Sequence, residues 1–298
     1  MTENLYINYS EFNPSRLIKT NAISNTVPHS SPQITYYTLP ILYNYDVVDK
    51  NNVHHDVQAP LAIETPILKA TQGIIINKFT DSKSSNKPNS YSMLTVFDIN
   101  NPEIAKFVSQ EGFWKTLYDH YLERMWEIKN VIKYQQKKEF LKGSFTYPIF
   151  IPKNTETNED SKEKNPSKFF QLINDTKRNR KTIFRIPILD EETNDFKKVD
   201  WDMLKNTNIE FQPIIAFSHI YIGGGKMSFQ MKITEAVVTS IKSSYSESSQ
   251  KKVLNELSKN QEIISKLTQQ LSILSKEKKE ETKEVDDDEL DNLIDENP

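Results

Sequence analysis

Residues 214–233 constrain the fold of this chain more than any other stretch. They read IIAFSHIYIGGGKMSFQMKI and contain three of the six glycines in 298 residues. Apolar and polar side chains alternate from Met227 to Thr234, and a similar two-residue alternation precedes the glycines. Alternation with a period of two predicts a β-strand on each side, and glycines between two strands supply the positive φ angles of a tight turn. We therefore expect a β-hairpin here.

Gly225-Lys226 could also end a phosphate-binding loop, but the rest of that motif is missing. The motif G-x-x-x-x-G-K-[ST] requires a glycine where this chain has Ile220, and a serine or threonine where it has Met227. A phosphate loop also joins a strand to a helix, whereas both flanks here read as strands. The stretch does not predict a nucleotide-binding enzyme.

Residues that enzymes commonly use for catalysis are not arranged in recognisable motifs. The chain has no cysteine and five histidines, none of which has the spacing of a metal-ligating pair. No G-x-S-x-G or H-E-x-x-H motif occurs. We expect a binding protein without catalytic residues, metal or cofactor.

The composition predicts one folded domain flanked by polar segments. Hydrophobic residues make up 36% of the chain, below the usual share, which indicates one core with much solvated sequence. Residues 1–35 are rich in Ser, Asn and Pro and read as an irregular arm. Residues 36–242 contain several strand-like stretches separated by polar loops. The expected fold class is α+β, mainly β, with one long inserted helix.

The inserted helix has clear start and break signals. Asn101-Pro102 is a typical helix start, and apolar spacing predicts helical structure over residues 103–141 with a break at Gly112. Beyond it, residues 144–152 read as a strand and residues 199–207 as a single helical turn.

Residues 243–283 are predicted to form a separate helical segment. Apolar residues, with one asparagine among them, recur in this segment in alternating steps of four and three residues and would form the seam of a coiled coil. They are Val253, Leu257, Asn260, Ile264, Leu267, Leu271 and Leu274. This heptad series predicts a coiled coil and hence a homo-oligomer. A lone amphipathic helix docked on the domain is the alternative.

Residues 284–298 carry eight acidic residues and no basic ones. Without those charges, the net charge of −3 becomes +5. A basic body with an acidic tail indicates a surface that meets a polyanion. A disordered tail that only promotes solubility explains the same charges equally well.

Four phrases, taken in order, resemble the single-stranded DNA-binding proteins of nucleocytoplasmic large DNA viruses, of the mimivirus, asfarvirus and poxvirus types. PLAIETPILKATQGI is similar to that family's proline-flanked strand, and YSMLTVFDINNPEIAKFVSQEGFWKTLYDHYLERMWEI to its strand and long helix. TIFRIPILDEETNDF is similar to its basic-led strand, and NIEFQPIIAFSHIYIGGGKMSFQMKITEAVV to its final hairpin. The resemblance covers residues 58–241. This chain differs from the family at Tyr221, where the family usually has tryptophan, and at Met227, where the family usually has glycine after the lysine.

The resemblance implies an oligonucleotide-binding (OB) barrel with an inserted helix. Such barrels bind single strands through a basic groove and exposed aromatic rings. Phe169, Phe170 and Phe184 lie near the basic clusters, with Phe184, Trp114 and Trp126 expected in the core and Tyr221 suited to either role. The residues expected to contact nucleic acid are Lys142, Tyr147, Lys168, Lys177, Arg178, Arg180, Lys181, Arg185, Tyr221 and Lys226.

The function that follows is a single-stranded DNA-binding protein with little sequence preference, acting in viral DNA replication, recombination or repair. By resemblance to other single-strand binders, the acidic tail would compete with DNA and recruit replication proteins. The alternative is a structural, scaffold or virion protein that assembles through its coiled coil. No signal-like start or long apolar stretch occurs. We expect a soluble intracellular protein away from membranes, in the host cytoplasm or viral factory, that can also be packaged in the virion.

Overall fold

The computed structural model describes residues 5–28, 30–77, 90–153, 164–189 and 195–243. The chain divides into two units, Met1–Ser244 and Tyr245–Pro298, and all described residues belong to the first. The heptad segment and the acidic tail lie outside the described residues, so both remain predictions.

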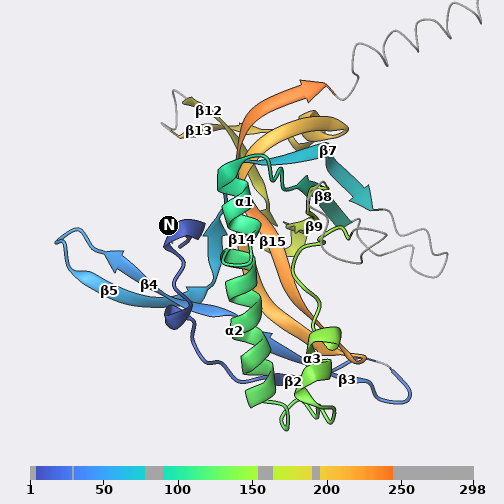
Figure 1. Ribbon diagram of the computed structural model, residues 1–298. Helices are drawn as coiled ribbons and strands as arrows, with labels where there is room; N and C mark the ends of the chain where they lie inside the picture. Colours follow the sequence, from blue (N-terminus) through green and yellow to red (C-terminus); the bar gives the residue numbers. More distant parts are fainter. Residues whose placement is uncertain (1–4, 29, 78–89, 154–163, 190–194, 244–298) are drawn as a thin grey trace, which may run out of the picture. The chain divides into compact units, whose positions relative to one another are not determined.

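Five strands of the first unit close into a barrel (Figure 1). β7 (Leu68–Asn77) pairs with β8 (Ser90–Val96), and β8 pairs with β9 (Ser167–Leu172), both antiparallel. β9 runs parallel to β15 (Lys226–Ser243), which pairs antiparallel with β14 (Thr207–Gly223). β14 also pairs antiparallel with β7 and completes the ring.

Around the ring, the strands follow the order β7, β8, β9, β15, β14. If the five strands are numbered along the chain, this order is one, two, three, five, four. This is a Greek-key order, as in the five-stranded OB barrel. The structure is therefore mainly β, with an OB-like barrel and one long helix, as expected. The helix is inserted between the second and third barrel strands.

The hairpin expected at residues 214–233 is confirmed as β14 and β15. Gly223 and Lys226 are the last register partners, so Gly224 and Gly225 alone form the turn, with φ of 60° and 75°. Positive φ at both central residues is the type I′ geometry that matches the twist of paired strands. At Gly223, a Cβ would lie 2.6 Å from the Tyr221 hydroxyl, so a larger residue there would displace the Tyr221 side chain.

β14 and β15 extend well beyond the barrel and take further partners. Three register shifts interrupt their pairing, and shifts of this kind bend a strand. β14 also pairs with β6 (Ala62–Glu64) and β3 (Thr35–Pro40), and β12 (Ile183–Leu189) runs parallel to β15. β13 (Phe196–Val199) pairs antiparallel with β12. β4 (Leu42–Val48) and β5 (His54–Pro60) form a separate hairpin.

Residues 5–35 are more regular than the arm that the composition predicts. β1 (Ile7–Asn8) pairs with β6, and β2 (Ile23–Thr26) pairs with β3. Leu17 is buried, and the ring of Phe12 lies 4.9 Å from that of Phe113. Pairing with distant strands outweighs the local preference of Ser, Asn and Pro for irregular structure.

Three helices connect β8 to β9: α1 (Pro102–Val108), α2 (Phe113–Glu127) and α3 (Lys138–Ser144). Asn101 caps α1, because its side chain accepts the N–H of Glu103 at 2.9 Å. Gly112 separates α1 from α2 as predicted, and a Cβ there would lie 2.4 Å from the Lys106 carbonyl oxygen. The apolar spacing predicts helix to residue 141, but α2 ends at Glu127. None of the helices in the described ranges is long and apolar enough to cross a membrane.

Figure 1 shows α2 lying across β14 and β15. Buried side chains of α2 and of the barrel strands belong to one core. Trp114 of α2 is fully buried, and its ring centroid lies 6.3 Å from that of Phe170 on β9 and 5.9 Å from that of Phe217 on β14. Elsewhere in the core, Trp201 begins the short 3-10 helix η4 (Trp201–Leu204), the single turn predicted at residues 199–207. Its ring packs on Phe184, which is buried as expected.

Residues 144–152 do not form the strand that their composition predicts. Two isolated bridges are present instead, Phe145 with Met227 and Phe150 with Ser167. Pro148 and Pro152 lack the N–H group that a continuous ladder requires, which explains the interruption.

Candidate nucleic-acid interface

A row of register partners crosses the outer face of the barrel. Gln171 of β9 pairs with Ser92 of β8 on one side and with Lys232 of β15 on the other. Lys232 in turn pairs with Ala216 of β14. Register partners project to the same side of a sheet, and the alternate residues, such as Phe170, point into the core. Most of the row is small or polar, so it forms a hollow with Lys232 in it.

This hollow is part of a groove of about 690 Å³, which we call the outer groove. Backbone and side-chain atoms from β8, β9, β14 and β15 line it, together with the loop that follows β9. The residues with small or polar side chains at its surface are Ser90, Gln171, Asn174, Thr176, Ala216, Ser218 and Thr234. These side chains offer hydrogen-bond partners, and the rest of the lining includes the apolar residues Pro60, Tyr91, Leu172, Ile173 and Phe217.

A hairpin rich in basic residues borders the outer groove. It consists of β10 (Asn174–Asp175), the 3-10 turn Thr176–Arg178 and β11 (Arg180–Lys181), and we call it the basic hairpin. Thr182 fixes its base, since the Thr182 hydroxyl donates to the Ile233 carbonyl at 2.6 Å and accepts the Ile173 N–H at 2.8 Å. The hairpin is thereby tied to β15 of the barrel.

Three basic residues, Lys177, Arg180 and Lys232, line the outer groove. Asp175 is the acidic residue among the described residues that line it. Its carboxylate accepts the N–H of Arg178 at 3.2 Å and pairs with Arg180 at 3.5 Å. Desolvation acts to raise the pKa of Asp175, but these hydrogen bonds outweigh it and lower the pKa. Asp175 is therefore ionised at neutral pH and offsets only part of the positive charge.

Two exposed phenylalanines lie on the face of the barrel that carries Gln171. Phe169 precedes Gln171 by two residues on β9, so the two side chains project to the same side about 7 Å apart. Phe169 is 57% exposed and Phe150 65% exposed. Phe150 is the register partner of Ser167, the next outward position on β9. A single exposed phenylalanine is ordinary, but two neighbours beside a basic groove offer flat surfaces for unstacked bases.

His219 adds a titratable group next to Lys232. It is the register partner of Gln230, and its Nδ1 lies 3.0 Å from the Ser218 hydroxyl. Burial, followed by the positive charge of Lys232, lowers the pKa of His219 below its ordinary value. The imidazole is consequently neutral at pH 7 and gains a charge only in more acidic solution.

Among the ten residues predicted to contact nucleic acid, Lys177 and Arg180 line the outer groove. Arg178 and Lys181 belong to the same basic hairpin but are not among the residues that line the groove. Arg178 lies 4.0 Å from the Asp175 carboxylate, and the Lys181 ammonium lies 4.5 Å from the centre of the Trp201 ring. The basic cluster is thus divided between the groove and its surroundings.

Lys168 and Arg185 have other environments. Lys168 is the register partner of buried Thr95, on the opposite side of β9 from Phe169. Burial lowers its pKa. Arg185 forms ion pairs with Glu235 and, at 3.4 Å, with Asp195. We therefore leave both residues out of the candidate interface.

The remaining four predicted residues lie near the other end of the β14–β15 hairpin. Tyr221 packs on Tyr36, with ring centroids 5.4 Å apart, and Tyr147 packs on Tyr118 at 5.0 Å. Lys226 begins β15 beside the turn, and Lys142 lies in the last turn of α3. Six residues of extended strand separate Lys226 from Lys232, which amounts to about 20 Å. The structure does not bring these residues into the outer groove.

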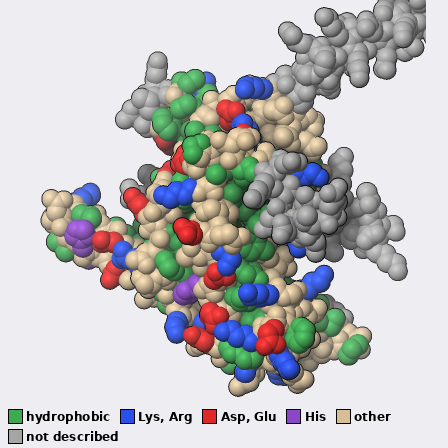
Figure 2. Space-filling model, in the orientation of Figure 1, with side chains coloured by type: hydrophobic (Ala, Val, Ile, Leu, Met, Phe, Trp, Pro, Cys, Tyr) green, Lys and Arg blue, Asp and Glu red, His purple; other side chains and the backbone are tan. Residues whose placement is uncertain are grey.

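Lysine and arginine residues on the helices do not form a uniformly basic surface. Figure 2 shows basic and acidic side chains intermingled over α2 and α3. The pairs include Arg124 with Glu127 at 2.8 Å and Lys138 with Glu123 at 2.6 Å. Because these charges neutralise one another locally, the helical face is a weaker candidate for a polyanion than the outer groove.

Sequence reasoning left Lys232, Phe169 and Phe150 out of the expected contact residues. The alternation of β15 places Lys232 outward, but an outward lysine on a strand looks like any solvated residue. Phe169 had a usable signal, since two adjacent phenylalanines on one strand must project to opposite faces. No local signal placed Phe150 beside it.

The arrangement can bind a chain of phosphates and flat rings, and the described residues offer no metal centre. No group of three or more His, Asp and Glu side chains comes together within the described ranges. A scan of the sequence against protein-family models gave no match, and neither did a search of curated proteins.

Proposed function

We propose that this protein binds single-stranded DNA along the outer groove, without a catalytic step. Phosphates would contact Lys177, Arg180 and Lys232, and an unpaired base would stack on Phe169. This role fits the resemblance to the single-stranded DNA-binding proteins of large DNA viruses, and with it a role in replication, recombination or repair. The observation that carries the proposal is the juxtaposition of this basic groove with exposed Phe169 on an OB-like barrel.

The exposed ring of Phe169 favours a single strand over a duplex as the ligand. Phosphate contacts alone would serve either ligand, since both carry a dense negative charge. Stacking on Phe169 requires a base whose face is free, which only a single strand provides. Polar side chains of the groove, such as Gln171 and Ser218, can hydrogen-bond to a backbone or to base edges without selecting a sequence.

Fluorescence anisotropy tests this proposal directly. Labelled oligo-dT, oligo-rU and a duplex of equal length are titrated with the full chain over a salt series. We expect oligo-dT to bind more tightly than the duplex, with an affinity that falls as salt rises. Oligo-rU differs from oligo-dT in the 2′-hydroxyl and in the base methyl group, and it shows whether the protein distinguishes RNA from DNA. Absence of oligo-dT binding at about 50 mM salt, where phosphate contacts dominate, would exclude the proposal.

The acidic tail is proposed to compete with DNA for the same basic groove and to recruit replication proteins. Replacing the eight acidic residues of 284–298 by Asn and Gln keeps the length of the chain and removes their charge. Oligo-dT should then bind more tightly at low salt, because eight competing charges are lost. Equal affinity of the two proteins would contradict competition.

The heptad segment is proposed to make the protein an oligomer. Replacing Leu267 and Leu271 by Ser should reduce the mass in solution, measured by light scattering, since both occupy the predicted seam. An oligomer that binds no single strand would instead support the scaffold function.

A further inference from the structure

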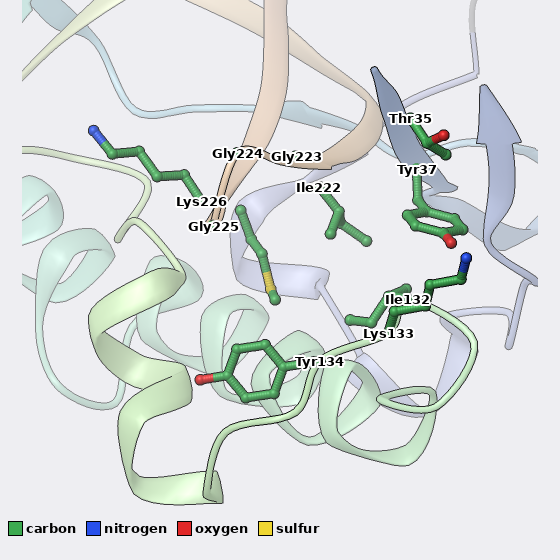
Figure 3. A pocket seen from close by; sticks show the side chains of 11 residues that line it. Thr35, Tyr37, Ile132, Lys133, Tyr134, Ile222, Gly223, Gly224, Gly225 and Lys226 are labelled. Carbon is green, nitrogen blue, oxygen red and sulfur yellow. The ribbon is translucent and has the colours of Figure 1, made fainter. Parts of the chain in front are cut away.

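A second cavity lies beneath the β14–β15 turn, and we call it the turn pocket (Figure 3). Its volume is about 290 Å³. Three segments line it: Thr35 and Tyr37 of β3, residues 132–134 after α2, and residues 222–227 around the turn. The lining side chains of Ile222 and Met227 project to the core side of the hairpin, whereas Lys232 projects to the outer groove. The two cavities are therefore separate.

The turn pocket combines an apolar floor with two aromatic rings. Ile132, Ile222 and Met227 are buried and provide the floor. Tyr37 and Tyr134 stand at the sides, and their rings flank the cavity in Figure 3. At the turn, a Cβ added to Gly224 or Gly225 would meet no atom within 4 Å, so no side chain crowds these two lining residues. Such a space fits a flat apolar group that enters from the turn.

The charge of the turn pocket is positive. Lys133 and Lys226 line it, and no acidic residue is among the described residues around it. In Figure 3, the Lys133 side chain points toward the Tyr37 hydroxyl at the rim, whereas the Lys226 ammonium points away from the cavity. Lys133 is thus placed to meet an anionic group beside the Tyr37 hydroxyl.

The backbone at Lys133 has a conformation that suits glycine better than lysine. The N–H of Tyr134 donates to the Lys129 carbonyl at 2.8 Å, and the N–H of Lys133 to the Asn130 carbonyl at 3.3 Å. These are the two bonds of a Schellman motif, in which glycine is favoured at the position of Lys133. The φ of Lys133 is 56°.

Other left-handed residues of the described chain follow the usual preference. The remaining non-glycine residues with positive φ are Asn52, Asn179 and Asn206, and asparagine tolerates this conformation. A lysine in this conformation at the rim of a cavity is the kind of strained residue that accompanies ligand binding.

The geometry points to a binding site for a mononucleotide unit in the turn pocket. The base would lie over the apolar floor between Tyr37 and Tyr134, and its phosphate would meet Lys133. The unit could be a free nucleotide or the phosphorylated end of a DNA strand, which share this chemistry. This site is additional to the outer groove and does not depend on it.

Isothermal titration calorimetry of the full chain with dTMP tests the site without any oligonucleotide. Thymidine, which lacks the phosphate, should bind more weakly. The variant Lys133→Gly should bind dTMP about tenfold or more weakly, because a charged hydrogen-bond partner is lost. Its thermal midpoint should equal or exceed that of the wild type, since glycine suits the left-handed position. Lys50→Gly, in the β4–β5 turn, removes the same charge elsewhere and should leave dTMP binding unchanged.

Equal dTMP affinity of Lys133→Gly and the wild type would overturn the proposal, as would the lack of dTMP binding to the wild type at millimolar concentration. A competition experiment assigns the source of the nucleotide. If 5′-phosphorylated oligo-dT displaces dTMP and 5′-hydroxyl oligo-dT does not, the site takes a strand end. If neither displaces it, the site takes a free nucleotide. The Lys232→Ala variant should retain dTMP binding in either case, which separates this site from the proposed function.

Discussion

Lys232 and Gln171 are register partners across the parallel pair of β9 and β15 that helps to close the barrel. Their side chains line the outer groove, although Gln171 precedes the basic hairpin and Lys232 belongs to the final strand. The basic hairpin and Lys232 therefore line one groove although they belong to segments that are distant in sequence.

Replacement of Lys232 by Ala should weaken oligo-dT binding and make it less sensitive to salt. One phosphate contact to a single strand accounts for a slope of about 0.7 in a plot of log affinity against log salt, so the slope should decrease by about that amount. Lys242→Ala is the matched control, because Lys242 is an exposed lysine farther along β15 that does not line the groove. Equal slopes for the wild type and Lys232→Ala would place the phosphates elsewhere.

Replacement of Phe169 by Ala should weaken oligo-dT binding by about 1–3 kcal/mol, the contribution of one base stacked on an aromatic ring. Because Phe169 is 57% exposed, its removal should change the free energy of unfolding little. Phe140→Ala is a control of similar exposure, 59%, on α3. Phe169→Trp should restore affinity, and anisotropy with urea unfolding measures both quantities. A loss of affinity for Phe140→Ala equal to that for Phe169→Ala would contradict a stacking role.

The turn at Gly224 and Gly225 could be predicted from sequence because its signal is local. Alternation on both sides and the glycines between them define the hairpin within about twenty residues. The closure of the barrel carries no such signal. Leu68 and Phe211 are register partners, but nothing near either residue indicates the other. The family resemblance, not the local pattern, led to the expectation of an OB-like barrel.

The candidate site was predictable only in part, for a related reason. The run from Lys177 to Lys181 identified the basic hairpin, but its turn geometry and Asp175 decide which cations reach the groove. Arg185 looks equally basic in sequence, yet its ion pair with Glu235 depends on the parallel pairing of β12 and β15. Partners of this kind follow from long-range packing and cannot be identified from a charge pattern.

Oligo-dT affinity should increase as the pH falls from about 7 to about 5, the range around the ordinary pKa of histidine. Burial and then the charge of Lys232 lower the pKa of His219 in the free protein, and a bound phosphate beside Lys232 would oppose the effect of that charge. The pKa of His219 is then higher in the complex, so binding takes up a proton and becomes tighter as the pH falls through that interval. Asp175 does not titrate there, because its pKa is lowered from an already acidic value.

The variant His219→Gln should remove this pH dependence. His120→Gln is the matched control, since burial also lowers the pKa of His120 but this residue lies on α2. Anisotropy at constant ionic strength across the pH range measures the effect, and thermal midpoints at each pH verify that both variants remain folded. A pH profile of His219→Gln identical to that of the wild type would mean that another group takes up the proton.

Replacement of Thr182 by Val should destabilise the protein and loosen the basic hairpin. Thr182 is buried, and its hydroxyl joins the Ile233 carbonyl to the Ile173 N–H. Valine has a similar shape but leaves both backbone groups without this partner, at a cost of about 1–3 kcal/mol for each group that stays buried and unpaired. Urea unfolding measures the loss, and hydrogen exchange should accelerate over residues 173–181.

Because Lys177 and Arg180 then lose their fixed position, oligo-dT affinity should also fall. Thr182→Ser keeps the hydroxyl and should retain most of the oligo-dT affinity. If hydrogen exchange over residues 173–181 is unchanged in Thr182→Val, other contacts hold the hairpin.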